Sequence, residues 1–148
     1  CARPGAASRP LPRNPTMPEY LVDSCVLIAH LRGHASTTEL LTRLALEGHL
    51  GVAAISRTEV IAGMREHERE RTLGFLNALI CYPLDAALAD LTGGYVGHYR
   101  TRGITLDIPD AMIAATAIHH RLVLLTYNPR HFPMPELHLY TPMPEIGS

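Results

Sequence analysis

Three acidic residues stand near the ends of predicted strands, where their carboxylates could share one cation. Asp23 and Glu59 each follow an apolar segment of strand length, and Asp110 opens an alanine-rich helix that leads into another such segment. Carboxylates a few ångströms apart repel one another, so such a group raises the pKa of a member or requires a bound cation. Ligand sets made only of oxygen atoms select Mg²⁺ or Mn²⁺ over zinc. The chemistry expected from this group is the binding of a hard divalent cation.

Each acid also has a structural explanation. Asp23, between a predicted strand and a predicted helix, suits the N-cap position. Ser56 and Glu59 have the S-x-x-E spacing of a capping box, which the chain repeats at 36–39, where no chemistry is expected. Asp110 suits the first turn of a helix, where the helix dipole favours an acid. Taken singly, each acid is better explained by structure, and the three suggest a site only as a group.

Predicted strands alternate with predicted helices along the chain. The strands are expected at 19–22, 50–54, 80–83, 122–125 and 136–140. The helices are expected at 24–31, 36–48, 57–66, 73–79 and 85–103, followed by the alanine-rich helix that begins around Pro109. This alternation predicts an α/β fold in which helices cover both faces of a parallel sheet. Ligands of such sheets bind at the carboxyl ends of the strands, where the acids are expected.

The size and composition indicate a single globular domain. The chain has 148 residues and a formal net charge of −1, and no apolar run approaches the roughly 20 residues that a membrane span needs. We expect residues 1–18 to be a disordered leader or the product of an upstream start codon, and residues 19–148 to form the domain. The three cysteines form no close pair, so Cys25 and Cys81 are expected to be small core residues rather than parts of a disulfide framework. This cysteine usage fits a reducing cytoplasm.

Four segments resemble the PIN-domain nucleases, specifically the VapC-type toxins of bacterial type II toxin–antitoxin pairs. They are LVDSCVLIAHL at 21–31, ISRTEVIAGM at 55–64, DIPDAMIAATA at 107–117 and LLTYNPRHF at 124–132. The resemblance covers nearly all of residues 19–140, and the order of the four segments makes it specific. It implies a three-layer α/β/α domain with a five-stranded parallel sheet. It also implies a Mg²⁺-dependent endoribonuclease, with Mn²⁺ as a possible substitute.

The resemblance also implies roles for individual residues. Asp23, Glu59 and Asp110 match the three family acids that bind the metal and carry out catalysis. Asp107 is expected to be a supporting ligand. Asn128 stands where many relatives carry a fourth acid, although asparagine also occurs there in such toxins. The loss of that negative charge is expected to weaken a second metal site.

Further residues are expected around the acids. Ser24 and Thr126 should orient the carboxylates by hydrogen bonds. Because an acidic pocket repels RNA, basic residues must line its rim. The candidates for RNA contact are Arg100, Arg102, Arg130 and His131, whereas Arg65, Arg69 and Arg71 are equally well explained as a solvated helix face. The partners implied by the resemblance are an RNA of the tRNA or rRNA class, a VapB-type antitoxin and a second copy of the chain.

Two other functions compete with this interpretation. The first is a PIN-like module that binds an antitoxin or RNA without cleaving it, which the asparagine at position 128 favours. The second is a metal-dependent phosphatase. The phosphatase is disfavoured because the D-x-D nucleophile pair after the first strand is absent, with Cys25 in the place of its second aspartate.

Overall fold

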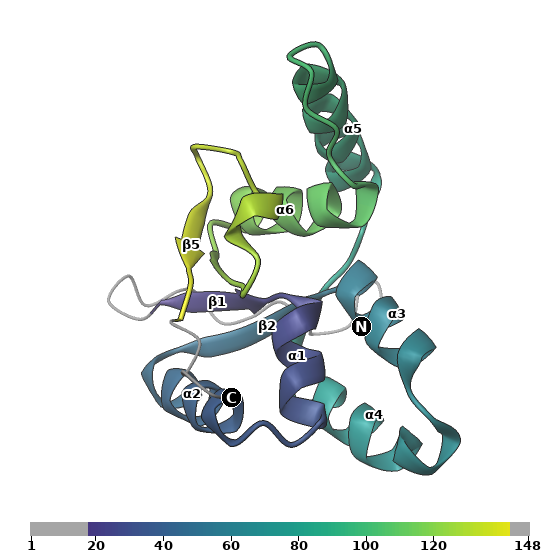
Figure 1. Ribbon diagram of the computed structural model, residues 1–148, viewed down its shortest axis with the longest axis vertical. Coiled ribbons are helices and arrows are strands. Elements are labelled where there is room, and N and C mark those ends of the chain that lie inside the picture. Colours follow the sequence, from purple (N-terminus) through teal and green to yellow (C-terminus); the bar gives the residue numbers. More distant parts are fainter. Residues whose placement is uncertain (1–17, 143–148) are drawn as a thin grey trace.

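The computed structural model of the chain describes residues 18–142 and shows an α/β fold (Figure 1). The predicted leader therefore falls almost wholly outside the described residues. The strands are β1 (Glu19–Val22), β2 (His49–Ala53), β3 (Ile80–Tyr82), β4 (Val123–Leu125) and β5 (His138–Tyr140). The helices are α1 (Ser24–Leu31), α2 (Ala35–Glu47), α3 (Ala54–Gly63), α4 (Arg69–Asn77), α5 (Ala86–Arg100) and α6 (Ile108–His120), with short 3₁₀ helices η1 (Glu66–Glu68) and η2 (Pro129–His131).

The five strands form one parallel sheet in the order β3-β2-β1-β4-β5. The predicted α/β class and the five-stranded parallel sheet are confirmed. The chain builds the sheet outward from β1 to β3 in one direction and then returns to add β4 on the other side of β1. The boundary between β1 and β4 is therefore the point where the strand order reverses, which is where open α/β sheets bind ligands.

Both faces of the sheet are covered, because successive side chains of a strand point to opposite faces. In β1, Leu21 joins one apolar cluster, whereas Tyr20 and Val22 join the other. The first cluster includes residues of α5 and α6, and the second includes residues of α1, α2, α3 and α4. Figure 1 shows α5 and α6 on one side of β1 and β2, and α1, α2 and α4 on the other. The layers are thus α/β/α.

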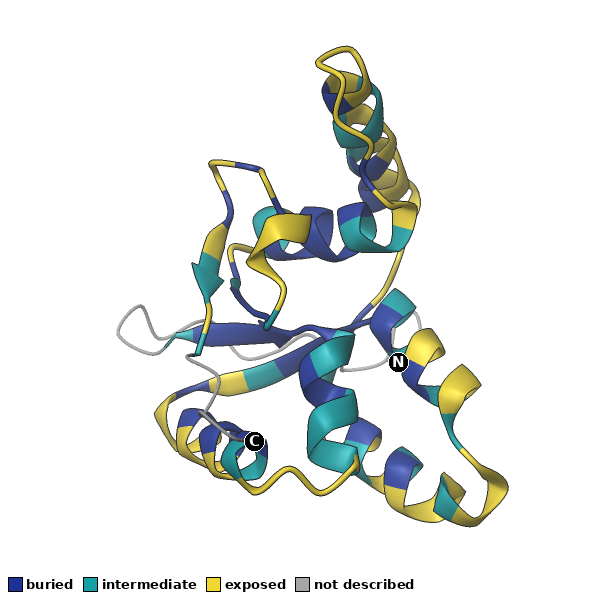
Figure 2. Cartoon of the chain, viewed as in Figure 1, coloured by how far each residue is buried: buried dark blue, intermediate teal, exposed yellow. Residues whose placement is uncertain are grey.

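The alanine-rich helix α6 packs tightly against the sheet. Ala111, Ala114, Ala115 and Ala117 are all fully buried, and Figure 2 shows the helix mostly in the colour of buried residues. Small side chains let the helix backbone approach the sheet closely. Asp107 occupies the N-cap position of α6 without a side-chain capping hydrogen bond, and Asp110 lies in the first turn.

Helix α3 begins three residues earlier than predicted, and this corrects the expected capping box. Strand β2 ends at Ala53, which is also the N-cap of α3, so no loop separates the strand from the helix. Ser56 consequently lies inside the helix, where its buried hydroxyl has no hydrogen-bond partner within the described residues. Glu59 is therefore in the second turn of α3, and its side chain takes no part in capping.

The two cysteines within the described residues differ in their bonding. Cys25 is a free thiol. Cys81 packs against the second apolar cluster as expected, but it is disulfide-bonded, so the expectation of a core cysteine outside any disulfide was wrong there. Sequence spacing alone does not reveal which cysteines meet in the fold.

Within residues 18–142, no helix combines the length and apolar character that crossing a membrane requires.

Candidate active site

The three predicted acids gather where β1 and β4 end. Asp23 directly follows β1, Glu59 projects from α3, and Asp110 lies in the first turn of α6. The acids are close enough to one another for their charges to interact. Asp23 and Asp110 both raise the pKa of Glu59, and Asp23 raises the pKa of Asp110. Residues that lie far apart in the sequence thus share one electrostatic environment at the carboxyl edge of the sheet.

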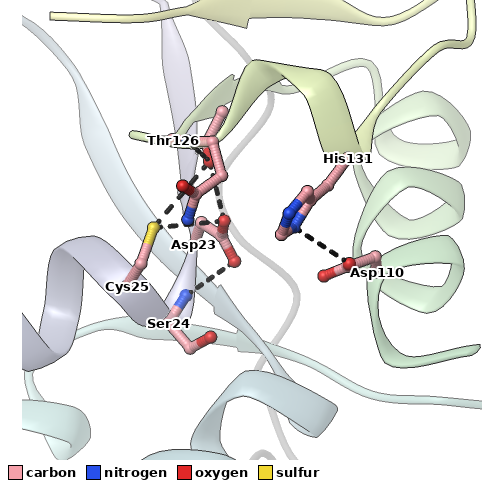
Figure 3. A network of polar contacts seen from close by, with 7 residues as sticks. Asp23, Ser24, Cys25, Asp110, Thr126 and His131 are labelled. Atoms are coloured by element: carbon pink, nitrogen blue, oxygen red, sulfur yellow. Dashed lines mark hydrogen bonds and ion pairs between the residues drawn. The ribbon is translucent and has the colours of Figure 1, made fainter. Parts of the chain in front are cut away.

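Three donors hold the Asp23 carboxylate in place (Figure 3). The Ser24 backbone N–H donates to Oδ1 at 2.8 Å, the Thr126 hydroxyl donates to Oδ2 at 2.7 Å, and the Cys25 thiol donates to Oδ2 at 3.3 Å. The residue is only 4% exposed. Hydrogen bonds to both oxygens offset the loss of hydration of a buried carboxylate. Asp23 also caps α1, so the same bonds fix the helix and the acid.

Thr126 connects Asp23 to the segment after β4. Its side chain is fully buried, and its hydroxyl accepts a 3.0 Å hydrogen bond from the Asn128 backbone N–H. The single hydroxyl proton is given to Asp23, so the oxygen lone pairs are available for Asn128. Asn128 itself is exposed and precedes η2. In this structure Asn128 is connected to the site by the hydrogen bond from its backbone N–H to the Thr126 hydroxyl.

Glu59 keeps contact with solvent, yet its pKa is raised. Partial loss of hydration is the largest cause, and the negative charges of Asp23, Asp110 and Asp107 add to it. A hydrogen bond from the Ser24 side chain acts in the opposite direction. Ser24 therefore serves two acids, with its backbone N–H on Asp23 and its side chain on Glu59.

Asp110 has a partner that the sequence did not predict. Nδ1 of His131 lies 3.2 Å from Oδ2 of Asp110, and Figure 3 shows the ring reaching from η2 toward α6. Burial raises the pKa of Asp110, His131 lowers it, and Asp23 and Asp107 raise it further. His131 was expected to contact RNA at the rim, and in the structure it rests on an acid. Its place shortly after Thr126 was the only hint in the sequence.

The donor chemistry of these acids fits a hard divalent cation, although the acids are not arranged as a finished coordination sphere. All the candidate ligands offer oxygen atoms, which suit Mg²⁺ and Mn²⁺. Burial is the largest cause of the raised pKa values of Glu59 and Asp110, and a cation would relieve the repulsion between the acids that adds to it. Across residues 18–142, no three His, Cys, Asp or Glu side chains form a group that could hold a metal ion as they stand.

A cleft of about 580 Å³ adjoins the acids. Asp107, Asp110, Arg130 and His131 line it together with residues 104–106 and Pro133. The structure therefore brings two of the predicted basic residues, Arg130 and His131, to the acids.

The other basic candidates lie elsewhere. Arg100 lines a different hollow with Ile108 and Met112. Arg102 lines a third hollow, where its Nη1 lies 2.6 Å from Nε2 of His98. Arg65 flanks η1, and Arg69 and Arg71 belong to α4, on the opposite side of the sheet from α6. Of the predicted basic residues, only those of η2 line the acidic cleft.

Comparisons with known proteins identify the family of the chain. Residues 20–135 match the PIN domain family, a span that contains Asp23, Glu59 and Asp110. Ribonuclease VapC10 of Mycobacterium tuberculosis is 38% identical over 114 residues, covering 77% of this chain and 86% of the relative. Ribonuclease VapC19 of the same species is 35% identical over 115 residues, covering 77% of this chain and 92% of the relative.

A solved structure shares the fold as well. A toxin–antitoxin complex from Klebsiella pneumoniae contains a chain that superposes with a TM-score of 0.71 at 28% identity, covering 84% of this chain and 98% of that one. The span matched by the PIN domain family holds all three acids, the whole of strands β2, β3 and β4, and β1 from its second residue onward. The chain therefore belongs to the PIN-domain family, as a ribonuclease toxin of the VapC type.

Proposed function

We propose that this chain is a Mg²⁺-dependent endoribonuclease that hydrolyses RNA phosphodiester bonds, with Mn²⁺ able to replace Mg²⁺. The observation that carries the proposal is the electrostatic coupling of Asp23, Glu59 and Asp110 at the carboxyl edge of β1 and β4. Acids that destabilise one another in this way are suited to sharing a cation. The relatives named as ribonucleases support the same reaction class.

Asp23, Glu59 and Asp110 would hold the cation, with Asp107 and Asn128 in supporting positions. A metal bound there would lower the pKa of the attacking water and stabilise the leaving oxygen. Asp23 would be the fixed ligand, because three donors already set the direction of its carboxylate. Glu59 and Asp110 are less buried, so their side chains can adjust.

Ser24 and Thr126 would act by positioning the acids rather than by touching RNA. Thr126 is fully buried, and its hydroxyl hydrogen-bonds to the Asp23 carboxylate and to the Asn128 backbone N–H, so it would not contact RNA. Arg130 and His131 would contact the substrate, because they line the cleft beside the acids. Arg100 and Arg102 would contact only more distant parts of a large RNA of the tRNA or rRNA class.

We also propose a cytoplasmic role in which a VapB-type antitoxin neutralises the enzyme. The similar chain from Klebsiella pneumoniae comes from a toxin–antitoxin complex, which supports this partner.

A second copy of the chain would cover the hollow of about 310 Å³ between α5 and α6, where Ile108 is 54% exposed. Light scattering should then show a dimer for the wild type and a monomer for Ile108→Arg, and a monomeric wild type would contradict the pairing.

A catalytically inactive binding module is the second candidate. Two observations favour it: the asparagine at position 128, and the lack of a ready three-ligand group within residues 18–142. Such a module would still bind an antitoxin or RNA through the same cleft, and it would leave the RNA intact.

RNA cleavage by the purified protein separates the two candidates. The wild type should cut RNA with Mg²⁺ or Mn²⁺, EDTA should stop the reaction, and Asp110→Asn should abolish it while circular dichroism shows an intact fold. Asp90→Asn, a change to an exposed aspartate of α5, is the matched control and should cut like the wild type. Binding of RNA without cleavage would favour the inactive module. Equal cleavage by Asp110→Asn would place the activity outside this site.

A further inference from the structure

The cleft beside the acids contains a mixture of chemical groups that a metal site does not need. Besides Asp107 and Asp110 it is lined by the hydroxyl-bearing Thr105, the cationic Arg130 and the apolar Leu106 and Pro133. A site that only held a cation would need the carboxylates and water. Apolar surface next to a cation and hydrogen-bonding groups suits an organic group with flat faces and polar edges.

Several of the polar groups in the cleft are available to a ligand. Within the described part of the chain, the side chains of Thr105, Asp107 and Arg130 make no hydrogen bond or ion pair, and all three residues are exposed. Asp107 occupies the N-cap position of α6 without capping it. Acids at N-caps ordinarily accept hydrogen bonds from the helix N–H groups. The Asp107 carboxylate accepts none from α6, so its oxygen atoms can accept hydrogen bonds from a ligand.

The charges in the cleft argue for a base rather than a phosphate. Asp107 and Asp110 would repel a phosphate, whereas a nucleobase is neutral and can offer N–H donors to a carboxylate. Arg130 and the His131 ring supply planar surfaces on which unpaired bases stack in RNA complexes. The volume of about 580 Å³ lies within the range of pockets that enclose small organic ligands.

We propose that this cleft binds the unpaired nucleotide adjacent to the bond that is cut, and that Asp107 selects its base. The proposal rests on the ribonuclease function proposed above. With the scissile phosphate at the metal site near Asp110, the neighbouring nucleotide is the part of the RNA that can enter the cleft. A base within a duplex would first have to leave its stack, so the cleft favours loops and single strands.

In this proposal the Asp107 carboxylate binds the base in place of a supporting role at the metal, and this makes the proposal specific about the base. A carboxylate accepts hydrogen bonds and donates none, so it pairs with the amino groups of cytosine, adenine or guanine. Uracil has no amino group, and its one donor on the pairing edge, the N3–H, lies between two carbonyl oxygens that would repel the second oxygen of the carboxylate. The enzyme should therefore cut least often next to uracil.

Sequencing the products from a random single-stranded RNA library tests the proposal. Wild type, Asp107→Asn, Thr105→Val and Arg130→Ala would each be assayed with Mg²⁺, with Asp90→Asn and Thr42→Val as matched controls at exposed positions outside the cleft. The wild type should show a base preference at one position flanking the cut, with uracil disfavoured. Asp107→Asn should change the ratio of uracil to amino-bearing bases by about tenfold, because an amide can also donate.

The outcomes separate this proposal from the ribonuclease function itself. A wild type that cuts no RNA would overturn both. Cleavage by Asp107→Asn that is slower at every sequence by the same factor would overturn the base pocket and leave Asp107 as a supporting metal ligand. An unchanged rate with an unchanged base preference would also overturn it, and would assign the cleft to another occupant such as an antitoxin segment.

Discussion

The hydroxyl of Thr126 donates a 2.7 Å hydrogen bond to Oδ2 of Asp23, joining the end of β4 to the end of β1. The bond spans the boundary at which the strand order of the sheet reverses. It fixes the acid that is most buried of the three and, through Asn128, the start of the turn that carries His131. One buried hydroxyl thus determines how two parts of the site meet.

Thr126→Val should weaken both the fold and the activity. Valine has the same shape but no hydroxyl, so Oδ2 of Asp23 would keep only the weak thiol donor of Cys25. Loss of one partner of a buried polar pair costs about 1–3 kcal/mol. Urea denaturation should show a loss of this size, and cleavage should fall mainly through kcat. Thr126→Ser retains the donor and should behave like the wild type; equal stability of the valine variant would show that the bond contributes little.

Glu59→Gln should stabilise the protein at neutral pH while removing activity. Because the pKa of Glu59 is raised in the folded state, ionisation of this side chain opposes folding, and stability falls as pH rises from the ordinary glutamate pKa through the raised one. The amide carries no charge and avoids this loss. Solvent screening at this exposed position limits the gain to less than about 1 kcal/mol.

Denaturation of both proteins at pH 4 and pH 7 measures the effect of Glu59→Gln. The two proteins should be equally stable at the lower pH, and the variant should be more stable at the higher one. A variant that is less stable at pH 7 would show that the hydrogen bond from Ser24 outweighs the repulsion from the neighbouring acids.

The sequence predicted those parts of the site that depend on the order of strands and helices. Asp23 could be located because an aspartate between a strand and a helix must lie at the carboxyl edge of a parallel sheet. The uninterrupted apolar run at 122–125 predicted a strand buried on both faces, and Leu124 and Leu125 indeed enter opposite apolar clusters. The local sequence pattern is enough to predict a strand when every side chain of the segment lies in an apolar environment.

The contact between Asp110 and His131 could not be predicted in this way. It depends on the direction in which η2 leaves the sheet, and the residue before η2 is held there by the hydrogen bond from the Asn128 N–H to the Thr126 hydroxyl. The early start of α3 was missed for a similar reason. Ala53 and Ala54 join β2 to α3 without a loop, and the serine at position 56 looked like a better helix start than either alanine.

His131→Ala should raise the pKa of Asp110. In the wild type His131 lowers that pKa by its charge and by its hydrogen bond, while burial and the other acids raise it. Carbon-13 NMR titration of labelled aspartate carboxyls in the metal-free protein measures the change directly. His131→Gln can donate a hydrogen bond without charge and should restore part of the difference. An Asp110 pKa that does not move in either variant would show that the contact does not persist in solution.

Mg²⁺ or Mn²⁺ should raise the melting temperature of the wild type, because an ion that binds only the folded chain stabilises it by mass action. At a hundredfold excess over Kd the gain is about 2.7 kcal/mol, or roughly 5–10 °C for a domain of this size. Asp23→Asn, Glu59→Gln and Asp110→Asn should each lose most of this shift. Asp90→Asn, on α5 away from the acids, should keep it in full. A shift that all three site variants retain would mean that the ion binds elsewhere on the chain, and the coupling among the acids would then need a different explanation.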